Sequence, residues 1–149
     1  MAFGAPSLKG RALRLLAQRE HSRVELERKL AKYEEEPGTL AKALDELQAR
    51  DFLNDTRVVQ SVLHQRAGRL GAMRLRQELQ QKGIDAQAIS SAMEQLKDTE
   101  LQRAREVWQR RFGELPVDAA ERARQTRFLL ARGFSGAIVG RVLKGAGDE

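Results

Sequence analysis

The sequence repeats itself with a period of about 50 residues, and this repeat limits the possible folds more than any other feature. At an offset of 49 residues, breaks and apolar positions of the first copy return in the second: Ser22 and Gly71, Leu26 and Leu75, Leu30 and Leu79, Leu40 and Ile89, Leu44 and Met93, Leu47 and Leu96. At an offset of 50, Lys82-Gly83-Ile84 returns as Arg132-Gly133-Phe134. Such a period is the signature of an array of small structural units.

Each copy contains three segments whose apolar residues recur at helical spacing. Leu, Ala, Arg, Glu and Gln, which favour helices, are abundant, and no segment alternates as a strand does. We therefore expect an all-α fold of three tandem three-helix units in an elongated, curved array. The expected limits are a flexible tail at 1–7, units at 8–53, 54–97 and 98–145, and a frayed tail at 146–149.

Polar residues in front of these segments predict where helices begin. Ser22 and Glu25 have the spacing of a capping box, and we expect further caps at Ser7, Thr39, Asp55, Asp85, Asp118 and Ser135. Gly83 and Gly133 predict helix ends, and a helix lined by Phe112 and Leu115 is expected to end near Pro116. Leu44 and Met93 are predicted to be equivalent buried positions.

The sequence offers little catalytic chemistry. It has no cysteine, which excludes disulfides and thiolate sites, and no glycine-rich phosphate loop. His21 lies between two predicted helices, where capping or hydrogen bonding is favoured over catalysis, and His64 lies on a polar helix face. The run Glu34 to Glu36 is interpreted as a solvated turn. We therefore expect no enzymatic activity, no cofactor and no bound metal.

Basic residues remain as candidates for a binding surface. The net charge is +6, and residues 54–97 carry seven basic and four acidic residues. Arginine suits both nucleic-acid phosphates and acidic protein grooves, although any single one can be ordinary helix surface paired with a glutamate. The candidate partner-binding residues are Arg57, Arg66, Arg69, Arg74, Arg76, Lys82, Arg127 and Arg132. Other arginines populate the last unit, among them Arg103 and Arg110.

Arg57 has a competing interpretation. It follows the expected cap by two residues, where a cation opposes the helix dipole. It therefore either pairs locally with Asp51 or Asp55 or serves a partner. Phe3 and Tyr33 are the candidates for exposed aromatic residues.

No apolar run is long enough to span a membrane, and the first residues do not have the pattern of a signal peptide. We expect a cytoplasmic protein, without a membrane partner, that is a monomer.

Four strings, in order, resemble the RecX family of regulatory proteins. They are residues 16–26 (LAQREHSRVEL), 52–57 (FLNDTR), 71–84 (GAMRLRQELQQKGI) and 128–135 (FLLARGFS), followed by Ile138 and Val142-Leu143. The resemblance covers about residues 8–145. One departure is Val58-Val59, where the family usually has an aromatic residue and alanine; this concerns local packing more than function.

The resemblance implies three tandem three-helix repeats. It also implies binding in the groove of the filament that the RecA recombinase forms on single-stranded DNA. Damping of the recombinase, ATPase and coprotease activities of RecA would follow. The alternative is a helical repeat protein whose main activity is direct binding to single- or double-stranded DNA; a generic helical scaffold comes third.

Overall fold

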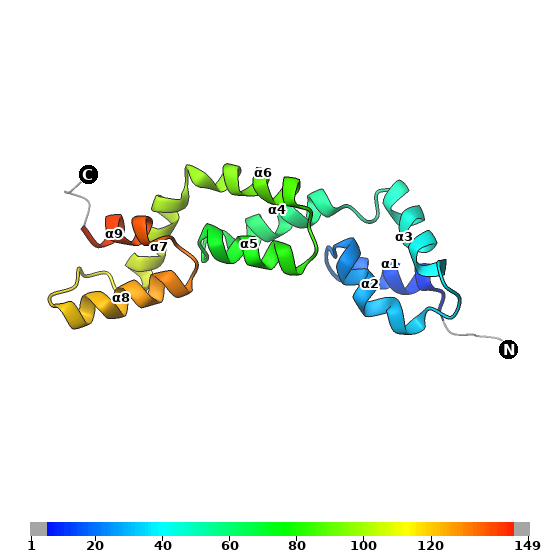
Figure 1. The fold of residues 1–149 in the computed structure, drawn as a ribbon, viewed down its shortest axis with the longest axis horizontal. Coiled ribbons are helices and arrows are strands. Elements are labelled where there is room, and N and C mark those ends of the chain that lie inside the picture. Colours follow the sequence, from blue (N-terminus) through cyan, green and yellow to red (C-terminus); the bar gives the residue numbers. More distant parts are fainter. Residues whose placement is uncertain (1–5, 145–149) are drawn as a thin grey trace.

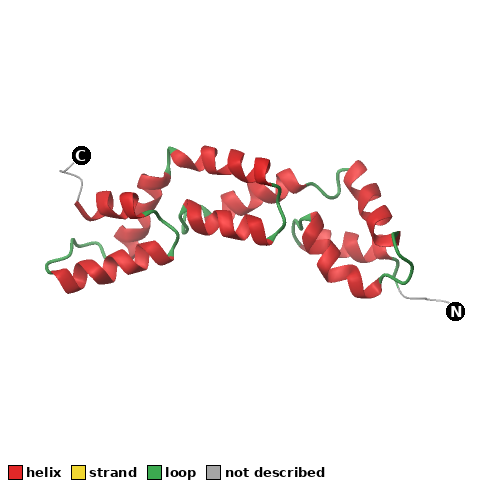
Figure 2. Ribbon diagram, in the orientation of Figure 1, coloured by secondary structure: helices red, strands yellow, loops and turns green. Residues whose placement is uncertain are grey.

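The computed structural model describes residues 6–144, which contain helices and no strand. The first three α-helices are α1 (Leu8–Gln18), α2 (Arg23–Leu30), which continues into a short 3-10 helix η1 (Ala31–Tyr33), and α3 (Thr39–Ala49). The next are α4 (Asp55–Arg66), α5 (Ala72–Gln81) and α6 (Ala86–Lys97). The last are α7 (Glu100–Arg111), α8 (Ala119–Ala131) and α9 (Gly136–Lys144). The predicted all-α fold is confirmed (Figure 2).

The helices pack in three groups of three, each around its own apolar core. We call α1–α3 the first unit, α4–α6 the second and α7–α9 the third. The first core contains Leu26, Leu44 and Leu47, all fully buried. The second contains Leu75 and Leu79, and the third contains Leu129 and Phe134. Because each unit buries its own apolar face, neighbouring units need to share only a narrow contact.

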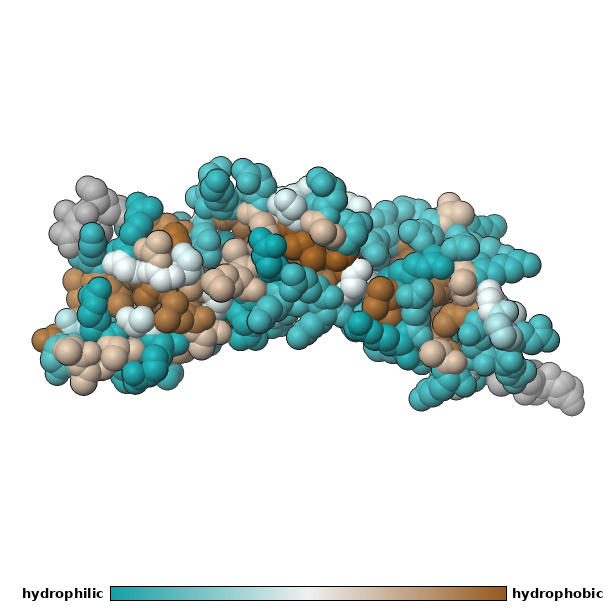
Figure 3. Space-filling model, viewed as in Figure 1, coloured by the Kyte–Doolittle hydropathy of each residue, from teal (hydrophilic) through white to brown (hydrophobic). Residues whose placement is uncertain are grey.

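The three units follow one another along the long axis of the molecule, with α8, α5 and α2 arranged in one row (Figure 1). The outline is bent, and its concave side faces downward in Figure 3. The predicted elongated, curved array is confirmed. It is elongated because one helix of each unit lies in this row. Tails were expected at 1–7 and 146–149; of these, residues 1–5 and 146–149 lie outside the described residues.

Most of the predicted caps are confirmed. Ser7, Ser22, Asp85 and Asp118 each accept a hydrogen bond from a main-chain N–H three residues later. Ser22 and Glu25 form the complete capping box, and Ser135 accepts from the N–H of Ile138 at 3.2 Å.

Two caps were predicted one residue too late. Gly38, not Thr39, precedes α3, and Asn54, not Asp55, caps α4 by accepting from the N–H of Arg57 at 3.1 Å. Asn54 and Asp55 both have the chemistry of a cap, so sequence alone does not decide between them. Asp55 instead accepts from the N–H of Arg23, at the start of α2, at 3.0 Å.

Two further expectations were wrong in detail. Helix α7 ends at Arg111 rather than near Pro116, because Gly113 turns the chain with a φ of 73°. Met93 is only partly buried, whereas Leu44 is fully buried; Ala92, one residue before Met93, lies in the second core. The repeat therefore preserves the helices but rotates the buried face of α6 slightly relative to that of α3.

Candidate interaction surface

Two similar contacts hold the row of helices together. In the first junction, the start of α2 meets the end of α5, where the Ser22 hydroxyl donates to the Lys82 carbonyl at 2.6 Å. In the second junction, the start of α5 meets the end of α8, where the Gly71 N–H donates to the Arg132 carbonyl at 2.8 Å. Both contacts join a helix N-terminus to a helix C-terminus, so the opposed partial charges attract.

Two cations at the first junction, Arg19 and Lys82, pair with the same carboxylate. Glu25 accepts from Arg19 at 2.8 Å and lies 3.3 Å from the Lys82 ammonium group. Burial alone would raise the pKa of Glu25, but the hydrogen bonds from Arg19 and the Ser22 N–H, with the charge of Lys82, lower it to about 2. Glu25 is therefore ionised at neutral pH and neutralises the cations around it.

Arg57 is also held by carboxylates. Its guanidinium group lies 2.9 Å from Glu20 in the first unit and 2.9 Å from Asp51. It also donates to the carbonyls of Asp51 and Phe52. The hydrogen bond to Glu20 raises the pKa of Arg57 further. Of the two interpretations of Arg57, the structure favours local pairing, with Asp51 rather than Asp55 as the near partner.

The second junction is surrounded by arginines that rest on main-chain carbonyl oxygens instead. Arg74 donates to Ala131 at 3.0 Å, and Arg110 donates to Gly68 at 2.9 Å. Arg132 stands 3.5 Å from the Arg69 carbonyl. A carbonyl oxygen satisfies an N–H group but does not cancel the positive charge. Across residues 6–144, none of Arg74, Arg103, Arg110 and Arg132 forms an ion pair with a carboxylate.

Arg103 is the most buried of these four. It donates to the carbonyls of Ala67 at 2.8 Å and Leu70 at 2.7 Å, and so ties α7 to the loop between α4 and α5. Burial lowers the pKa of Arg103 from its usual value. Arg103 and Arg110 were not among the candidates, and the sequence gives only one signal for them, an excess of arginine over acid in the last unit.

The remaining candidates divide into two kinds. Arg66 forms an ion pair with Glu78, as Lys82 does with Glu25. Arg69, Arg76 and Arg127 are exposed, and none of them forms an ion pair within residues 6–144. The second junction therefore brings Arg69, Arg74 and Arg132 together, whereas Arg57 and Lys82 belong to the first junction.

His21 has a structural role. It is buried, its Nδ1 lies 3.0 Å from the Arg19 carbonyl, and its Nε2 lies 3.1 Å from the Lys29 ammonium group. Burial lowers the pKa of His21, so the ring is neutral at pH 7, with Nδ1 as the donor and Nε2 as the acceptor. The hydrogen-bonding role predicted for His21 is confirmed.

Among the described residues, no group of three or more His, Cys, Asp or Glu side chains is placed to hold a metal ion. None of the described helices is long and apolar enough to cross a membrane.

Comparison with known protein families gives three matches in the order of the units. Residues 9–47 match the first three-helix domain of RecX, residues 54–93 the second, and residues 98–143 the third. Together the matches cover most of the chain.

Curated relatives and solved structures agree with these matches. The regulatory protein RecX of Leptothrix cholodnii is 55% identical over 151 residues, which cover 100% of this chain and 96% of the relative. The regulatory protein RecX of Ralstonia nicotianae is 49% identical, with 96% and 94% covered. The crystal structure of RecX from Lactobacillus salivarius superposes with a TM-score of 0.76 at 20% identity, covering 92% of each chain, and supports the fold. This chain belongs to the RecX family of regulatory proteins.

Proposed function

We propose that this protein regulates the RecA recombinase by binding along the groove of the RecA filament on single-stranded DNA. Binding there inhibits the recombinase, ATPase and coprotease activities of RecA. The protein acts in the cytoplasm as a monomer, without catalysis of its own. Family membership over the whole chain supports the identity of the partner, because the curated relatives are named regulatory proteins.

The observation that carries the proposal is the charge of the second junction. Its arginines rest on carbonyl oxygens, so their positive charge remains available to an acidic groove or to phosphates. A bent array of three units suits a long, helical partner, because each unit can contact a different part of it.

The proposed contact surface keeps all eight candidates but ranks them by their neighbours. Arg69, Arg76 and Arg127 are exposed and provide charge directly. Arg74 and Arg132 contribute charge from the second junction. The remaining candidates, Arg57, Arg66 and Lys82, border the surface and contribute less, because carboxylates neutralise them.

The test is inhibition of the DNA-dependent ATPase activity of RecA. Reversal of the three exposed arginines (Arg69→Glu, Arg76→Glu and Arg127→Glu) should raise the half-inhibitory concentration roughly tenfold or more. The triple reversal of Lys42, Arg50 and Lys97 to Glu is the matched control, because these residues are also exposed and the charge change is equal. Both variants should keep wild-type helicity, since exposed charges contribute little to stability.

Two results would contradict the proposal. If the wild-type protein fails to inhibit RecA, the proposed function is wrong. If both variants lose inhibition equally, net charge rather than this surface is responsible.

A further inference from the structure

A second basic feature lies in the first unit, outside the candidates considered above. It is a cleft of about 560 Å³ between α1 and the segment formed by α2 and η1. Five cations and no carboxylate line it, together with the exposed ring of Tyr33. The cations are Arg11, Arg14, Arg28, Lys29 and Lys32.

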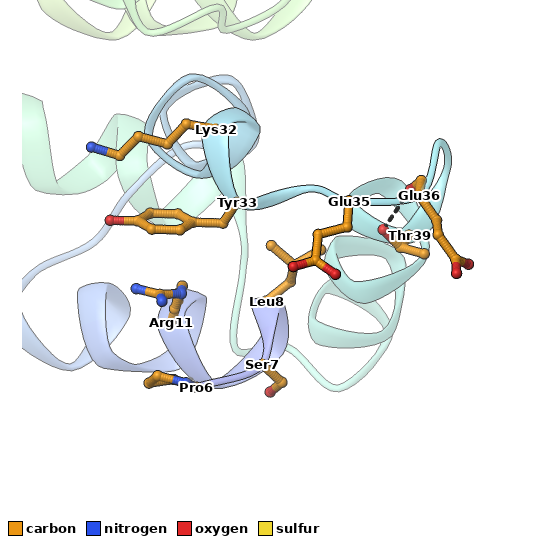
Figure 4. Close-up of a pocket in the computed structure, with 9 residues that line it drawn as sticks. All are labelled: Pro6, Ser7, Leu8, Arg11, Lys32, Tyr33, Glu35, Glu36 and Thr39. Atoms are coloured by element: carbon orange, nitrogen blue, oxygen red, sulfur yellow. Dashed lines mark hydrogen bonds between the residues drawn. The ribbon is translucent and has the colours of Figure 1, made fainter. Parts of the chain in front are cut away.

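The cations and the ring are arranged together. The Arg11 guanidinium group stacks on the Tyr33 ring, 3.7 Å from its centre, and the Lys32 ammonium group lies 5.3 Å from the centre. Figure 4 shows the ring between these two side chains, all three pointing to the same side. Glu35 and Glu36 point to the other side, where they line an adjoining hollow of about 470 Å³ that shares Arg11, Lys32 and Tyr33 with the cleft.

The charge of this cleft is not cancelled within the unit. Arg28 donates to the Gln81 carbonyl at 2.6 Å, and Lys29 contacts the Nε2 atom of His21. Within residues 6–144, none of the five cations forms an ion pair with a carboxylate. Cations gathered without counter-charges repel one another, so this arrangement is favoured when an anion is bound.

We propose that this cleft binds the sugar–phosphate backbone of a single-stranded nucleic acid, with the Arg11–Tyr33 stack supporting a base. Proteins that bind single strands combine a positive groove with aromatic and arginine surfaces on which bases stack. The cleft volume is in the range of small-ligand sites and suits a short stretch of nucleotides. An acidic peptide would satisfy the cations but would place no flat group on the outer face of the Arg11 guanidinium group, which stacks on Tyr33.

This inference goes beyond the proposed function because it requires no RecA. Its test is fluorescence anisotropy of a labelled single-stranded oligothymidine, titrated with the protein alone at several salt concentrations. The cleft variant carries Arg14→Glu and Lys32→Glu, both at exposed positions. The control carries Lys42→Glu on α3 and Arg50→Glu directly after it, which change the charge equally outside the cleft.

We expect the wild-type protein and the control to bind within about twofold of one another, and the cleft variant to bind roughly tenfold or more weakly. The slope of log affinity against log salt should fall by about 1.4 in the cleft variant, since each lost phosphate contact on a single strand removes about 0.7. Tyr33→Leu should weaken binding roughly tenfold, whereas Tyr33→Phe, which retains the ring, should stay within about threefold.

Three outcomes would overturn the inference: no binding by the wild-type protein, equal weakening in the cleft and control variants, or displacement of the oligonucleotide by polyglutamate of equal charge as readily as by unlabelled oligothymidine. RecA inhibition is measured separately on the same proteins. If the wild-type protein binds the oligonucleotide but does not inhibit RecA, the proposed function alone is rejected. The reverse result rejects the cleft alone.

Discussion

The two junctions join the same ends of helices but differ in chemistry. Each brings the start of one row helix against the end of another, and equivalent positions of the two junctions are 49 residues (Ser22 and Gly71) or 50 residues (Lys82 and Arg132) apart in the sequence. The first is closed by the Ser22 hydroxyl; its cations Arg19 and Lys82 pair with Glu25, whereas Arg28 rests on a carbonyl oxygen, that of Gln81. The second is closed by the main chain of Gly71, and its arginines rest on carbonyl oxygens. Both junctions therefore use a contact between a helix start and a helix end to build the array. The arginine charges around the second junction are not needed for this contact and remain available to a partner.

The largest expected difference in stability between the two junctions comes from substituting the glycines that follow α5 and α8. Gly133 has a φ of 96°, and an added Cβ would lie 2.5 Å from the main-chain nitrogen of Arg74. Gly83 has a φ of 73°, and the atoms nearest to its added Cβ, at 2.2–2.9 Å, belong to the side chain of Val24 rather than to main chain. Alanine strains the backbone at both sites by roughly 1–2 kcal/mol, and overpacking adds about 1–3 kcal/mol where the neighbour does not move.

We therefore expect Gly133→Ala to reduce the free energy of unfolding by about 3 kcal/mol and Gly83→Ala by roughly 1–2 kcal/mol, measured by urea denaturation. Gly68→Ala is the control, because nothing lies within 4 Å of its added Cβ. Equal losses for Gly83 and Gly133 would mean that the second junction is as adaptable as the first.

Acid should weaken the first junction selectively, through Glu25. Its pKa is about 2 in the folded protein and near 4.5 without these contacts. A lowered carboxyl pKa stabilises the fold fully above pH 4.5, and this stability is lost as the pH falls from 4.5 towards 2. Allowing for screening at the partly exposed Arg19, the contribution is on the order of 2 kcal/mol.

The measurement compares urea midpoints of the wild-type protein and Glu25→Gln between pH 6 and pH 2.5. Glutamine retains the capping geometry but does not titrate, so the variant should have the shallower pH dependence. Identical pH profiles would show that Glu25 does not couple protonation to stability.

The smallest effect concerns the hydroxyl that distinguishes the two junctions. Ser22 both caps α2 and donates to Lys82, whereas Ser7 caps α1 and has no junction bond. Loss of an N-cap costs about 1 kcal/mol, and loss of a further hydrogen bond costs about another. Ser22→Ala should therefore reduce the free energy of unfolding by about 1 kcal/mol more than Ser7→Ala does. Equal losses would show that the junction does not depend on the hydroxyl.

The repeat and the caps allowed the fold to be predicted from sequence. Helical spacing and capping residues act over three or four residues, so the pattern around Ser22 or Asp85 is sufficient to place a helix start. The errors were small and local, as at Asp55 and Met93, where neighbouring residues have equivalent chemistry. The unit limits at 8–53, 54–97 and 98–145 stay a prediction.

The candidate site was harder to predict, because the neighbours of an arginine come from distant parts of the chain. Arg57 pairs with Glu20 of the preceding unit, and Arg103 donates to the carbonyl of Leu70. Whether a guanidinium group meets a carboxylate or a carbonyl depends on how the units dock. The cleft cations look like ordinary surface residues on two separate helices, and only the packing of α1 against α2 brings Arg11 and Lys32 to the same tyrosine.

The row of α8, α5 and α2 also governs how folding cooperativity spreads through the molecule. Its units are coupled only to nearest neighbours, like sites on a one-dimensional lattice. The second unit has a neighbour on both sides, whereas each terminal unit has one. Breaking one junction uncouples a single unit and leaves a coupled pair, so thermal opening starts at the two ends of the array and reaches the central unit last.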